Sequence, residues 1–272
     1  MQASVAWTPP TGTLGRIVAE AELRAQALET RLDELAADAE ETLPGPSLER
    51  ALRGTTVAVI AEVKRRSPSK GAIAEGLDAA DQALAYLAGG AAAVSVLTEP
   101  AHFGGSVGDF VAVRDRVQIA ALKKDFHVAP VQLVEARALG ASAALLIARA
   151  ISPARLLEMM ATGRSLGLEM LVEVRDEHEL ARALDGGATM IGVNNRDLET
   201  LEIDPTTCER IIPAIPRSVL AIAESGMRSR ADVERYAACG ADAVLVGSML
   251  SASGDAAAAT RALADVARRA RD

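Results

Sequence analysis

At 272 residues the chain is long for one compact domain, although parallel α/β barrels of this length often fold as a single unit. Half of the residues are hydrophobic but only 2% are aromatic, so Val, Ile, Leu and Ala must build most of the core. That composition is typical of parallel strands buried on both faces. The formal net charge of −8 argues against a nucleic-acid surface. It allows an anionic substrate, because a few local cations can dominate the field inside a cleft.

The sequence carries no signal for a membrane span, a leader or a disulfide framework. No apolar run approaches the length of a membrane span, and the N-terminus lacks a charged segment followed by an apolar stretch. The two cysteines, Cys208 and Cys239, form no CxxC pair and are expected to pack between helices. We therefore expect a cytoplasmic protein with no membrane or nucleic-acid partner. We expect a monomer, with a weak homodimer as the alternative.

The first part of the chain predicts a helical extension. Residues 1–12 contain two prolines and a glycine and predict an irregular arm. From about Leu14 to Glu41, leucines recur at helix-compatible spacing among Glu, Arg and Ala. A Pro-Gly-Pro run breaks this pattern, and a further short helix is expected after it. We expect residues 1–54 to form an extension that packs onto a domain of residues 55–272.

After this extension, apolar strand-like runs alternate with helical patterns. The strand-like runs are Val57–Val63, Ala92–Leu97, Val117–Leu122, Ala143–Ile147, Glu169–Val174, Met190–Val193, Val219–Ala223 and Ala243–Val246. The helical patterns cover Ala79–Ala88, Pro130–Leu139, Pro153–Leu166, Glu177–Leu184, Arg230–Ala238 and a stretch from about Asp255. Strands that alternate with helices predict a parallel sheet.

A parallel sheet of this size is either an open doubly wound sheet or a closed barrel. No GxGxxG motif follows the first strand, which argues against the open dinucleotide-binding sheet. Polar residues also cluster at the C-terminal ends of many strands, where a barrel carries its active site. The sequence therefore predicts a single (β/α)₈ TIM barrel.

Charged residues stand at the ends of the first and third strands. Period-two alternation places Glu62 and Lys64 on one face, which can be the upper rim of the barrel interior. Buried charges are costly unless they are paired or used, so the two form either a structural ion pair or an acid–base or anion-binding pair. Lys124, followed by Asp125 and Phe126, is a candidate proton donor beside a ring-binding wall. A solvated charge run is the alternative.

Further polar residues follow the fifth and sixth strands. Glu173 interrupts an apolar run near the C-terminal end of the fifth strand. The sixth strand leads into Asn194 and Arg196, which are candidates to bind a carboxylate or hydroxyl groups, because arginine matches a carboxylate in a bidentate way. These side chains extend the predicted site across the barrel mouth.

The last two strands predict a phosphate site. They end in Ser225-Gly226 and Gly247-Ser248, and small residues there let backbone N–H groups approach a phosphate. The loops after strands seven and eight are the usual phosphate site of a barrel. These two dipeptides, which stand at the ends of the last two strands, together predict that the substrate is phosphorylated.

The histidines point to no metal. His102, His127 and His178 are each expected at the surface, and no pair has metal-ligand spacing. We therefore expect neither a metal nor a cofactor.

Taken together, these segments resemble the indole-3-glycerol-phosphate synthase family. The matching segments occur in order between about Leu14 and the C-terminus, and the ordered set carries the resemblance rather than any one motif. They are Ile60–Lys64, Ser67–Gly71, Val96–Glu99, Phe103–Ser106, Lys124–Phe126, Leu171–Val174, Ile191–Asn194, Arg196–Leu198, Ala223–Gly226 and Val246–Ser248.

The resemblance implies a carboxy-lyase of tryptophan biosynthesis that needs no cofactor. Its substrate would be 1-(2-carboxyphenylamino)-1-deoxyribulose 5-phosphate, which closes to indole-3-glycerol phosphate with loss of carbon dioxide and water. The catalytic residues it implies are Lys124, Glu173, Lys64, Glu62, Asn194 and Ser225. The substrate-binding residues it implies are Ser67, Arg196, Phe103, Phe126, Leu145, Gly226, Gly247 and Ser248.

Within that set, Lys124 is the candidate acid for ring closure, and Glu62, Glu173 and Lys64 are the candidates for dehydration. The chain departs from the family at Ala129–Gln132, where Asp-Pro-Tyr-Gln is common, and at His102, where an aromatic residue is common. Two alternatives stay open. One is another phosphate-binding barrel of the pathway, of the phosphoribosylanthranilate isomerase or tryptophan synthase α type. The other is a barrel that binds phosphate without catalysis.

Overall fold

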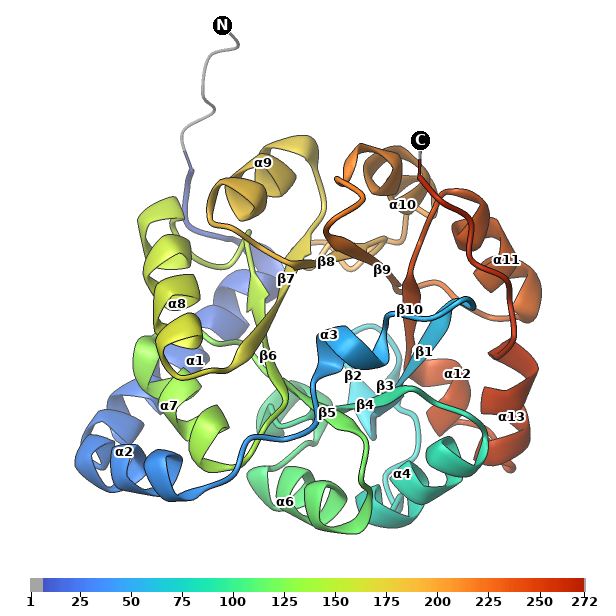
Figure 1. The fold of residues 1–272 in the computed structure, drawn as a ribbon. Helices are drawn as coiled ribbons and strands as arrows, with labels where there is room; N and C mark the ends of the chain where they lie inside the picture. Colours follow the sequence, from blue (N-terminus) through green and yellow to red (C-terminus); the bar gives the residue numbers. More distant parts are fainter. Residues whose placement is uncertain (1–6, 272) are drawn as a thin grey trace, which may run out of the picture.

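The computed structural model describes residues 7–271, which form a closed barrel of parallel strands wrapped by helices (Figure 1). The barrel strands are β1 (Ala58–Val63), β4 (Ala93–Leu97), β5 (Ala120–Lys124), β6 (Ala143–Ile147), β7 (Glu169–Val174), β8 (Met190–Asn194), β9 (Leu220–Glu224) and β10 (Ala243–Val246). They are hydrogen-bonded in this order, and β10 pairs with β1 to close the barrel. The predicted (β/α)₈ architecture is confirmed, and an open sheet is excluded.

A helix follows each barrel strand and packs on the outside of the barrel. These helices are α4 (Ala79–Ala88), α6 (Val107–Arg116), α7 (Pro130–Ala138), α8 (Pro153–Ser165), α9 (Glu177–Asp185), α10 (Thr206–Ile211), α11 (Arg230–Ala238) and α13 (Ala256–Leu263). Several begin at a Ser or Asp whose side chain accepts a first-turn N–H, as Asp78 does for α4 and Ser152 for α8. No helix within residues 7–271 is long and apolar enough to cross a membrane.

Several details differ from the sequence-based expectation of the strands and helices. The third barrel strand begins at Ala120 rather than Val117, because Val117 is the C-terminal cap of α6. Helix α6 itself was not expected, since only Phe110 and Val113 of its residues are buried and the apolar pattern is sparse. Several short elements were also not expected: the hairpin β2 (Arg66–Ser67) and β3 (Gly71–Ala72), α5 (Pro100–Phe103), α10, the 3₁₀ turn η1 (Ile212–Ala214) and α12 (Ser248–Ser251).

The N-terminal segment forms α1 (Gly12–Glu29), α2 (Leu32–Glu41) and α3 (Leu48–Ala51). The expectation of one continuous helical pattern to Glu41 was wrong in one respect, because the chain turns at Thr30 and Arg31. The Thr30 hydroxyl donates to the Ala27 carbonyl at 2.8 Å, and Arg31 leaves the helical backbone region. The turn lets α1 cross the barrel mouth while α2 packs against α7.

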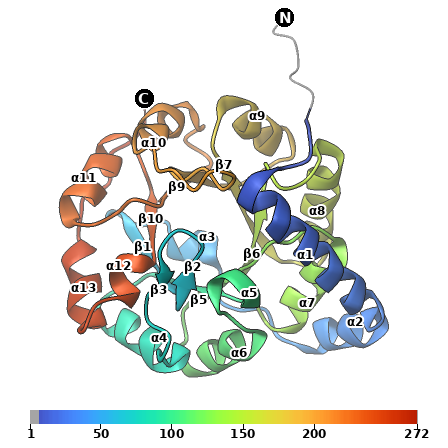
Figure 2. The same cartoon turned by 180° about the vertical axis from the view of Figure 1, so that it is seen from behind.

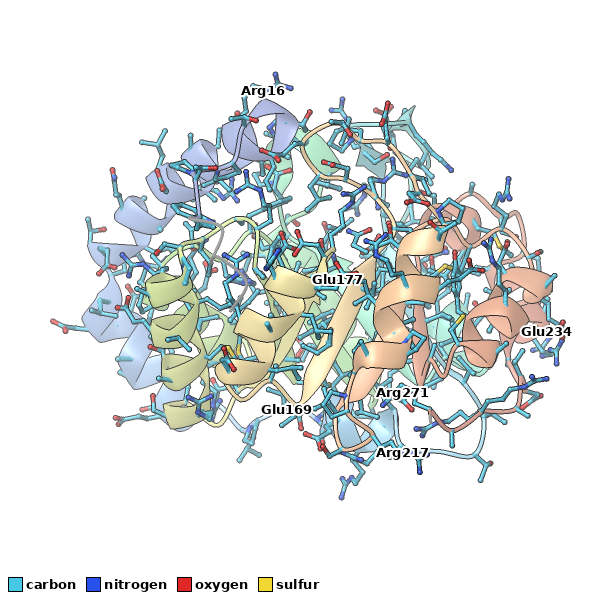
Figure 3. The ribbon with its side chains drawn as sticks, turned by 90° about the horizontal axis from the view of Figure 1, so that it is seen from above. Arg16, Glu169, Glu177, Arg217, Glu234 and Arg271 are labelled. Carbon is cyan, nitrogen blue, oxygen red and sulfur yellow. The ribbon has the colours of Figure 1, made fainter. Side chains whose placement is uncertain are left out.

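The extension contacts both ends of the barrel. Helix α3 lies at the N-terminal end, where the Ser47 hydroxyl donates to Glu169 at the start of β7 at 2.6 Å (Figure 1). Seen from the opposite side, α1 crosses the C-terminal end of the barrel (Figure 2). The side view agrees, because Arg16 of α1 lies at one end of the molecule and Glu169 and Arg217 lie at the other (Figure 3). The N-terminal extension therefore closes one end of the barrel and partly covers the other.

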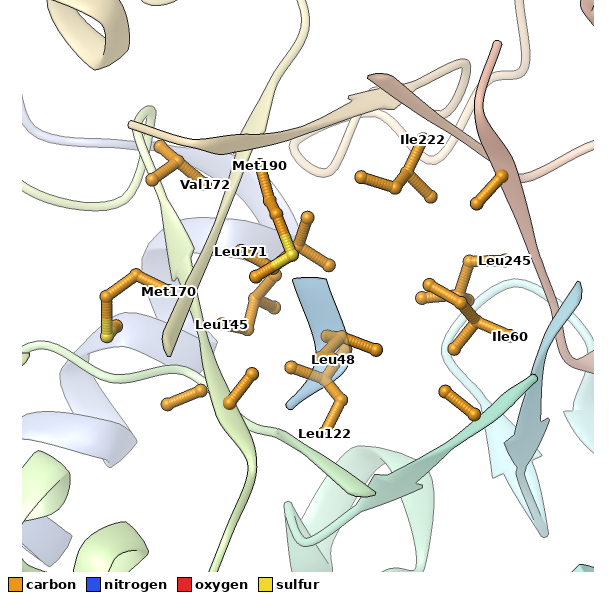
Figure 4. Packing of buried hydrophobic residues seen from close by; sticks show 14 of the residues in the cluster. Leu48, Ile60, Leu122, Leu145, Met170, Leu171, Val172, Met190, Ile222 and Leu245 are labelled. Carbon is orange, nitrogen blue, oxygen red and sulfur yellow. The ribbon is translucent and has the colours of Figure 1, made fainter. Parts of the chain in front are cut away.

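The barrel interior is filled by aliphatic side chains and methionine. Leu48 of α3 reaches into it from the N-terminal end, among Leu122, Leu145 and Met190 (Figure 4). Above this layer the inward positions turn polar, because each strand alternates with period two. Ile222, for example, is followed two residues later by Glu224, which is equally buried. The core thus ends in a layer of charged groups at the C-terminal mouth.

Candidate active site

A cavity of about 570 Å³ opens at the C-terminal mouth of the barrel. Its walls come from the ends of the barrel strands, the β2–β3 hairpin and helix α1, which contributes Thr13, Leu14 and Ile17. All fourteen residues that the sequence assigned to catalysis or substrate binding line this cavity: Glu62, Lys64, Ser67, Phe103, Lys124, Phe126, Leu145, Glu173, Asn194, Arg196, Ser225, Gly226, Gly247 and Ser248. The structure thus brings the whole predicted set together in one site.

The floor of the cavity is a buried cluster around the ammonium of Lys124. Its Nζ lies 3.2 Å from Glu173 Oε2 and 3.5 Å from Glu224 Oε2. The two carboxylates are only 4% and 3% exposed, so their interaction with the lysine is weakly screened by water. The alternative of a solvated charge run at Lys124 is therefore wrong.

The charges in this cluster shift one another's pKa values. Burial by itself lowers the pKa of Lys124, but the carboxylates of Glu224, Glu173 and Glu62 outweigh burial and raise it above its ordinary value. Burial raises the pKa of Glu224 to about 8, and Glu173 and Glu62 add to this rise against the opposing effect of Lys124. The cluster therefore favours the charged form of Lys124 and the protonated form of Glu224.

Glu173 is oriented by its neighbours as well as by Lys124. The Asn194 side-chain amide donates to Glu173 Oε1 at 2.8 Å, and Asn194 Oδ1 accepts the backbone N–H of Arg196 at 2.9 Å. One carboxylate oxygen thus faces the amide and the other faces the ammonium. This arrangement fixes the rotamer of Glu173 before any ligand binds, which is the preorganisation that acid–base chemistry needs.

Glu62 and Lys64 form an ion pair on the opposite side of the mouth, as their shared strand face predicts. Lys64 Nζ lies 3.0 Å from Glu62 Oε1 and 5.4 Å from the centre of the Phe103 ring. The Lys64 side chain is 17% exposed, so its ammonium borders the cavity rather than the core. A single cation here can contact both a substrate anion and the ring wall.

An apolar wall lies between the two charged groups. The rings of Phe103 and Phe126 are 6.0 Å apart and inclined at 37°, and Leu145 lines the same cavity. Leu14 and Ile17 of α1 cover the same space from above. A slot lined in this way fits a flat aromatic group, with Lys124 at its inner edge.

The ends of β9 and β10 form a polar loop pair with unusual backbone geometry. Ser225 has a φ of 63° and Gly226 a φ of 88°, so both lie in the left-handed region. For serine this conformation costs about 1–3 kcal/mol, and such strain is common at ligand sites. The Ser225 carbonyl accepts from the Asn195 amide at 3.0 Å, which holds the turn. A Cβ on Gly247 would collide with the Glu62 carboxylate, so glycine lets the end of β10 approach it closely.

Ser67 and Arg196 complete the polar lining. The Ser67 hydroxyl accepts the Lys70 backbone N–H at 3.2 Å, which shapes the β2–β3 hairpin. The Arg196 guanidinium donates to the Leu201 carbonyl at 2.7 Å, and burial lowers its pKa. Within residues 7–271, no carboxylate forms an ion pair with Arg196. Its remaining donors are therefore available to an anionic ligand in the cavity.

The sequence analysis missed Glu224 as a site residue, although its motif was recognised. Two signals in the sequence point to it: Glu224 follows the buried Ile222 by two residues, and Gly192 stands on the neighbouring strand. A Cβ at Gly192 would overlap the Glu224 carboxylate, so the glycine leaves room for it. The cavity-lining residues of α1 were also missed, because the sequence does not show where α1 crosses the mouth.

The expectation that His127 lies at the surface was wrong. His127 is 2% exposed, and its Nδ1 lies 2.8 Å from the Leu145 carbonyl. Burial and the nearby Lys123 lower its pKa to about 3, so the ring stays neutral. Lys123 itself points away from the cavity and pairs with Glu135 of α7 at 3.0 Å. This buried network supports the back of the strand that carries Lys124.

One group of side chains has the spacing of metal ligands, at Glu20, Glu99 and His102. Both Glu99 oxygens accept backbone N–H groups of α5, and Arg24 lies 3.6 Å from one of them. His102 pairs with Glu20 at 2.9 Å. These contacts explain the group as a helix cap and as ion pairs that attach α1 to the barrel.

The comparisons with known proteins agree with this geometry. The family model described as indole-3-glycerol phosphate synthase matches residues 14–263. The chain is 51% identical to the indole-3-glycerol phosphate synthase of Parafrankia sp. over 216 residues, which are 79% of this chain and 81% of that protein. It is 50% identical to indole-3-glycerol phosphate synthase 1 of Streptomyces coelicolor over 230 residues, which are 85% and 86% of the two chains.

Solved structures of lower sequence identity share the fold. A thiamine phosphate pyrophosphorylase from Pyrococcus furiosus has a TM-score of 0.59 at 15% identity, covering 80% of this chain and 96% of that one. A 3-hexulose-6-phosphate synthase from Salmonella typhimurium has a TM-score of 0.59 at 16% identity, covering 76% of this chain and 96% of that one. These likenesses concern the barrel alone. The family match and the relatives at about half identity show that this chain belongs to the indole-3-glycerol phosphate synthase family.

Proposed function

We propose that this protein closes the indole ring of 1-(2-carboxyphenylamino)-1-deoxyribulose 5-phosphate, releasing carbon dioxide and water and forming indole-3-glycerol phosphate. The observation that carries the proposal is the buried ammonium of Lys124, held between Glu173 and Glu224 at the inner edge of an apolar slot. Ring closure needs an acid at such a position, and dehydration needs a carboxyl group beside it.

In the first step the ring carbon that bears the carboxylate attacks the ribulose carbonyl carbon. Lys124 donates its proton to the carbonyl oxygen as that oxygen takes up the electron pair. The raised pKa keeps the proton on Lys124 until the oxygen becomes an alkoxide, which is a far stronger base. The carboxylate then leaves as carbon dioxide, and its bonding electrons restore the aromatic ring.

In the second step the new hydroxyl group leaves as water. We assign its protonation to Glu173, which first takes up a proton, because Asn194 and Lys124 hold this side chain at the edge of the slot. Removal of a ring proton completes the indole, and Glu62 is placed to accept it. Lys64 pairs with Glu62 at 3.0 Å and would orient it for this role.

The binding roles follow from charge and shape. Phe103, Phe126 and Leu145 would hold the anthranilate ring, and Arg196 would bind its carboxylate before decarboxylation. The loops at Ser225-Gly226 and Gly247-Ser248 would bind the phosphate through backbone N–H groups, with Lys64 supplying charge. Ser67 would contact the ribulose hydroxyl groups.

The site supports this reaction better than the reactions of the other phosphate-binding barrels of the pathway. Sugar isomerisation and aldol cleavage do not need a buried ammonium with three carboxylates around it. We also propose that the enzyme works in the cytoplasm as a monomer without a cofactor, with residues 1–54 as an extension to a barrel of residues 55–272.

The test is an assay of the purified protein for indole fluorescence with the proposed substrate. We expect fluorescence to rise with time and to need the carbonyl group, so an analogue in which the carbonyl is reduced to an alcohol should bind and inhibit without reacting. No fluorescence at micromolar enzyme, from protein shown to be folded by circular dichroism, would reject the proposal.

A further inference from the structure

A second, smaller cavity lies on the other side of Glu173. Its volume is about 110 Å³, and its lining shares Leu14, Glu173 and Asn194 with the main cavity. Glu173 therefore borders two spaces, one at the substrate slot and one behind it. The volume is enough for two or three water molecules, and the polar lining offers the hydrogen-bond partners that ordered water needs.

Glu179 is one of the residues that line this second cavity. Glu179 lies in the first turn of α9 and is only 4% exposed. Its Oε2 accepts the Arg175 backbone N–H at 2.7 Å, and its own N–H donates to Asp176 at 2.8 Å. These bonds resemble a helix cap and occupy one carboxyl oxygen. A helix cap does not require its acidic residue to be buried or to lie near Glu173.

Burial and the charged groups around Glu179 together shift its pKa upward. On its own helix these are Asp176, Arg182 and the adjoining Arg175, and from β7 it is Glu173. Burial raises the pKa of Glu179 to about 7, and Asp176 and Glu173 add to the rise, while the Arg175 N–H and Arg182 oppose it. The other charged residues around the cavity are Arg149, Arg196, Asp197 and Glu199.

The outer rim of the cavity reaches the molecular surface. Arg149, Arg175, Asp197 and Glu199 on this rim are half-buried, in contrast to Glu173 and Glu179. Arg175 pairs with Asp197 at 3.3 Å and Arg149 with Glu199 at 3.1 Å, so charged pairs frame the opening. A proton can therefore reach Glu179 from solvent without passing through the substrate slot.

The proposed reaction requires such a supply of protons. The substrate carries a carboxylate and a phosphate dianion, and the product carries only the phosphate dianion. Substrate trianion plus one proton gives product dianion, carbon dioxide and water, so each turnover consumes one proton. While product occupies the main cavity, the acid that gave up this proton cannot take up a new proton through the main cavity.

We propose that Glu179 supplies this proton to Glu173 through the second cavity. The inference rests on the proposed ring closure. The Glu179 O–H breaks as a water molecule in the cavity takes the proton, and the same water passes a proton to a Glu173 oxygen. Glu179 is left as a carboxylate and takes a proton from bulk water or buffer at the rim. Glu179 touches no substrate atom and acts only through Glu173.

The test compares Glu179→Gln with wild type in the pre-steady state. Glutamine still accepts the Arg175 N–H, so the cap and the fold are expected to persist, but it cannot supply a proton. We expect the first turnover, made by enzyme loaded in advance, to keep its rate in Glu179→Gln. Later turnovers should slow by about tenfold or more, giving a burst of indole fluorescence. Small acids such as imidazole should raise the rate of these later turnovers in proportion to their concentration. They should have no effect on wild type.

Two further variants make the outcome decisive. Glu177→Gln removes an exposed carboxylate from the same helical turn and should behave as wild type. Glu179→Asp keeps an ionisable acid and should retain steady-state turnover within about threefold of wild type. The proposal is overturned if Glu179→Gln shows wild-type steady-state turnover, if its first turnover is slowed equally, or if Glu179→Asp and Glu179→Gln are equally slow. Failure of wild type to form any product would instead reject the ring-closure proposal.

Discussion

Replacement of Lys124 by methionine tests the centre of the proposed mechanism. The change keeps most of the side-chain volume and removes the ammonium that lies 3.2 Å and 3.5 Å from two buried carboxylates. At an effective dielectric constant of about 20, each of these contacts contributes about 5 kcal/mol of gross attraction. Burial of the three groups offsets most of that attraction, and removal of one partner from a buried pair costs about 3–5 kcal/mol net.

Two results are expected at about pH 7.5. Turnover should fall by a factor of about 10²–10⁴ or more, because the acid for ring closure is missing. The free energy of unfolding should fall by about 3 kcal/mol relative to wild type, since the buried carboxyl groups of Glu173 and Glu224 lose their cationic partner. At about pH 5.5 this stability difference should shrink, because protonated carboxyl groups can stay buried without a cation beside them.

The assay combines initial rates from indole fluorescence with urea unfolding at both pH values. Lys124→Arg is the matched control, because it keeps the charge and should recover the stability without recovering full turnover. Turnover of Lys124→Met within tenfold of wild type would refute the role of Lys124 as the acid. Equal stability of the variant and wild type at both pH values would refute the account of the buried cluster.

Three further predictions concern other parts of the site and its support. Glu173→Gln should lower kcat by about 10²-fold or more with little change in KM, since Asn194 can still hold the glutamine; similar losses in kcat and substrate affinity would indicate a structural role. Arg196→Lys should raise KM by about tenfold and change kcat less, because lysine cannot bind a carboxylate in a bidentate way; an unchanged KM would exclude the carboxylate contact. As pH falls from 6.5 towards 3, wild type should lose stability, because His127 stays neutral in the folded protein but takes up a proton when unfolded. Urea unfolding of His127→Gln should show a weaker pH dependence in that window, and an identical slope would contradict the buried neutral imidazole.

The barrel could be predicted from the sequence because its signals are local. Apolar runs of five or six residues, such as those around Leu145 and Val172, indicate buried parallel strands, and glycines mark the ends of the helices between them. The short elements could not be predicted in this way. Helix α5 has four residues and none of them is buried, so it leaves no periodic pattern.

Site residues could be predicted where a strand has a charged residue at its C-terminal end and also lies in a segment that resembles the family. Glu62, Lys124 and Glu173 all meet this condition. Glu224 also meets it, but the neighbouring serine and glycine drew attention to phosphate binding instead. The position of His127 could not be predicted, because its burial depends on Lys123 pointing outward and on the carbonyl of Leu145 in the next strand.

The coupling of decarboxylation to ring closure is the central claim, and a single-turnover measurement tests it most directly. With enzyme in excess over substrate at about pH 7.5, carbon dioxide release and indole fluorescence would be followed on the same sample. We predict one carbon dioxide for each indole formed, with both signals lost in Lys124→Met. Carbon dioxide without indole, or a new fluorescent product that retains the carboxylate, would contradict the proposed mechanism.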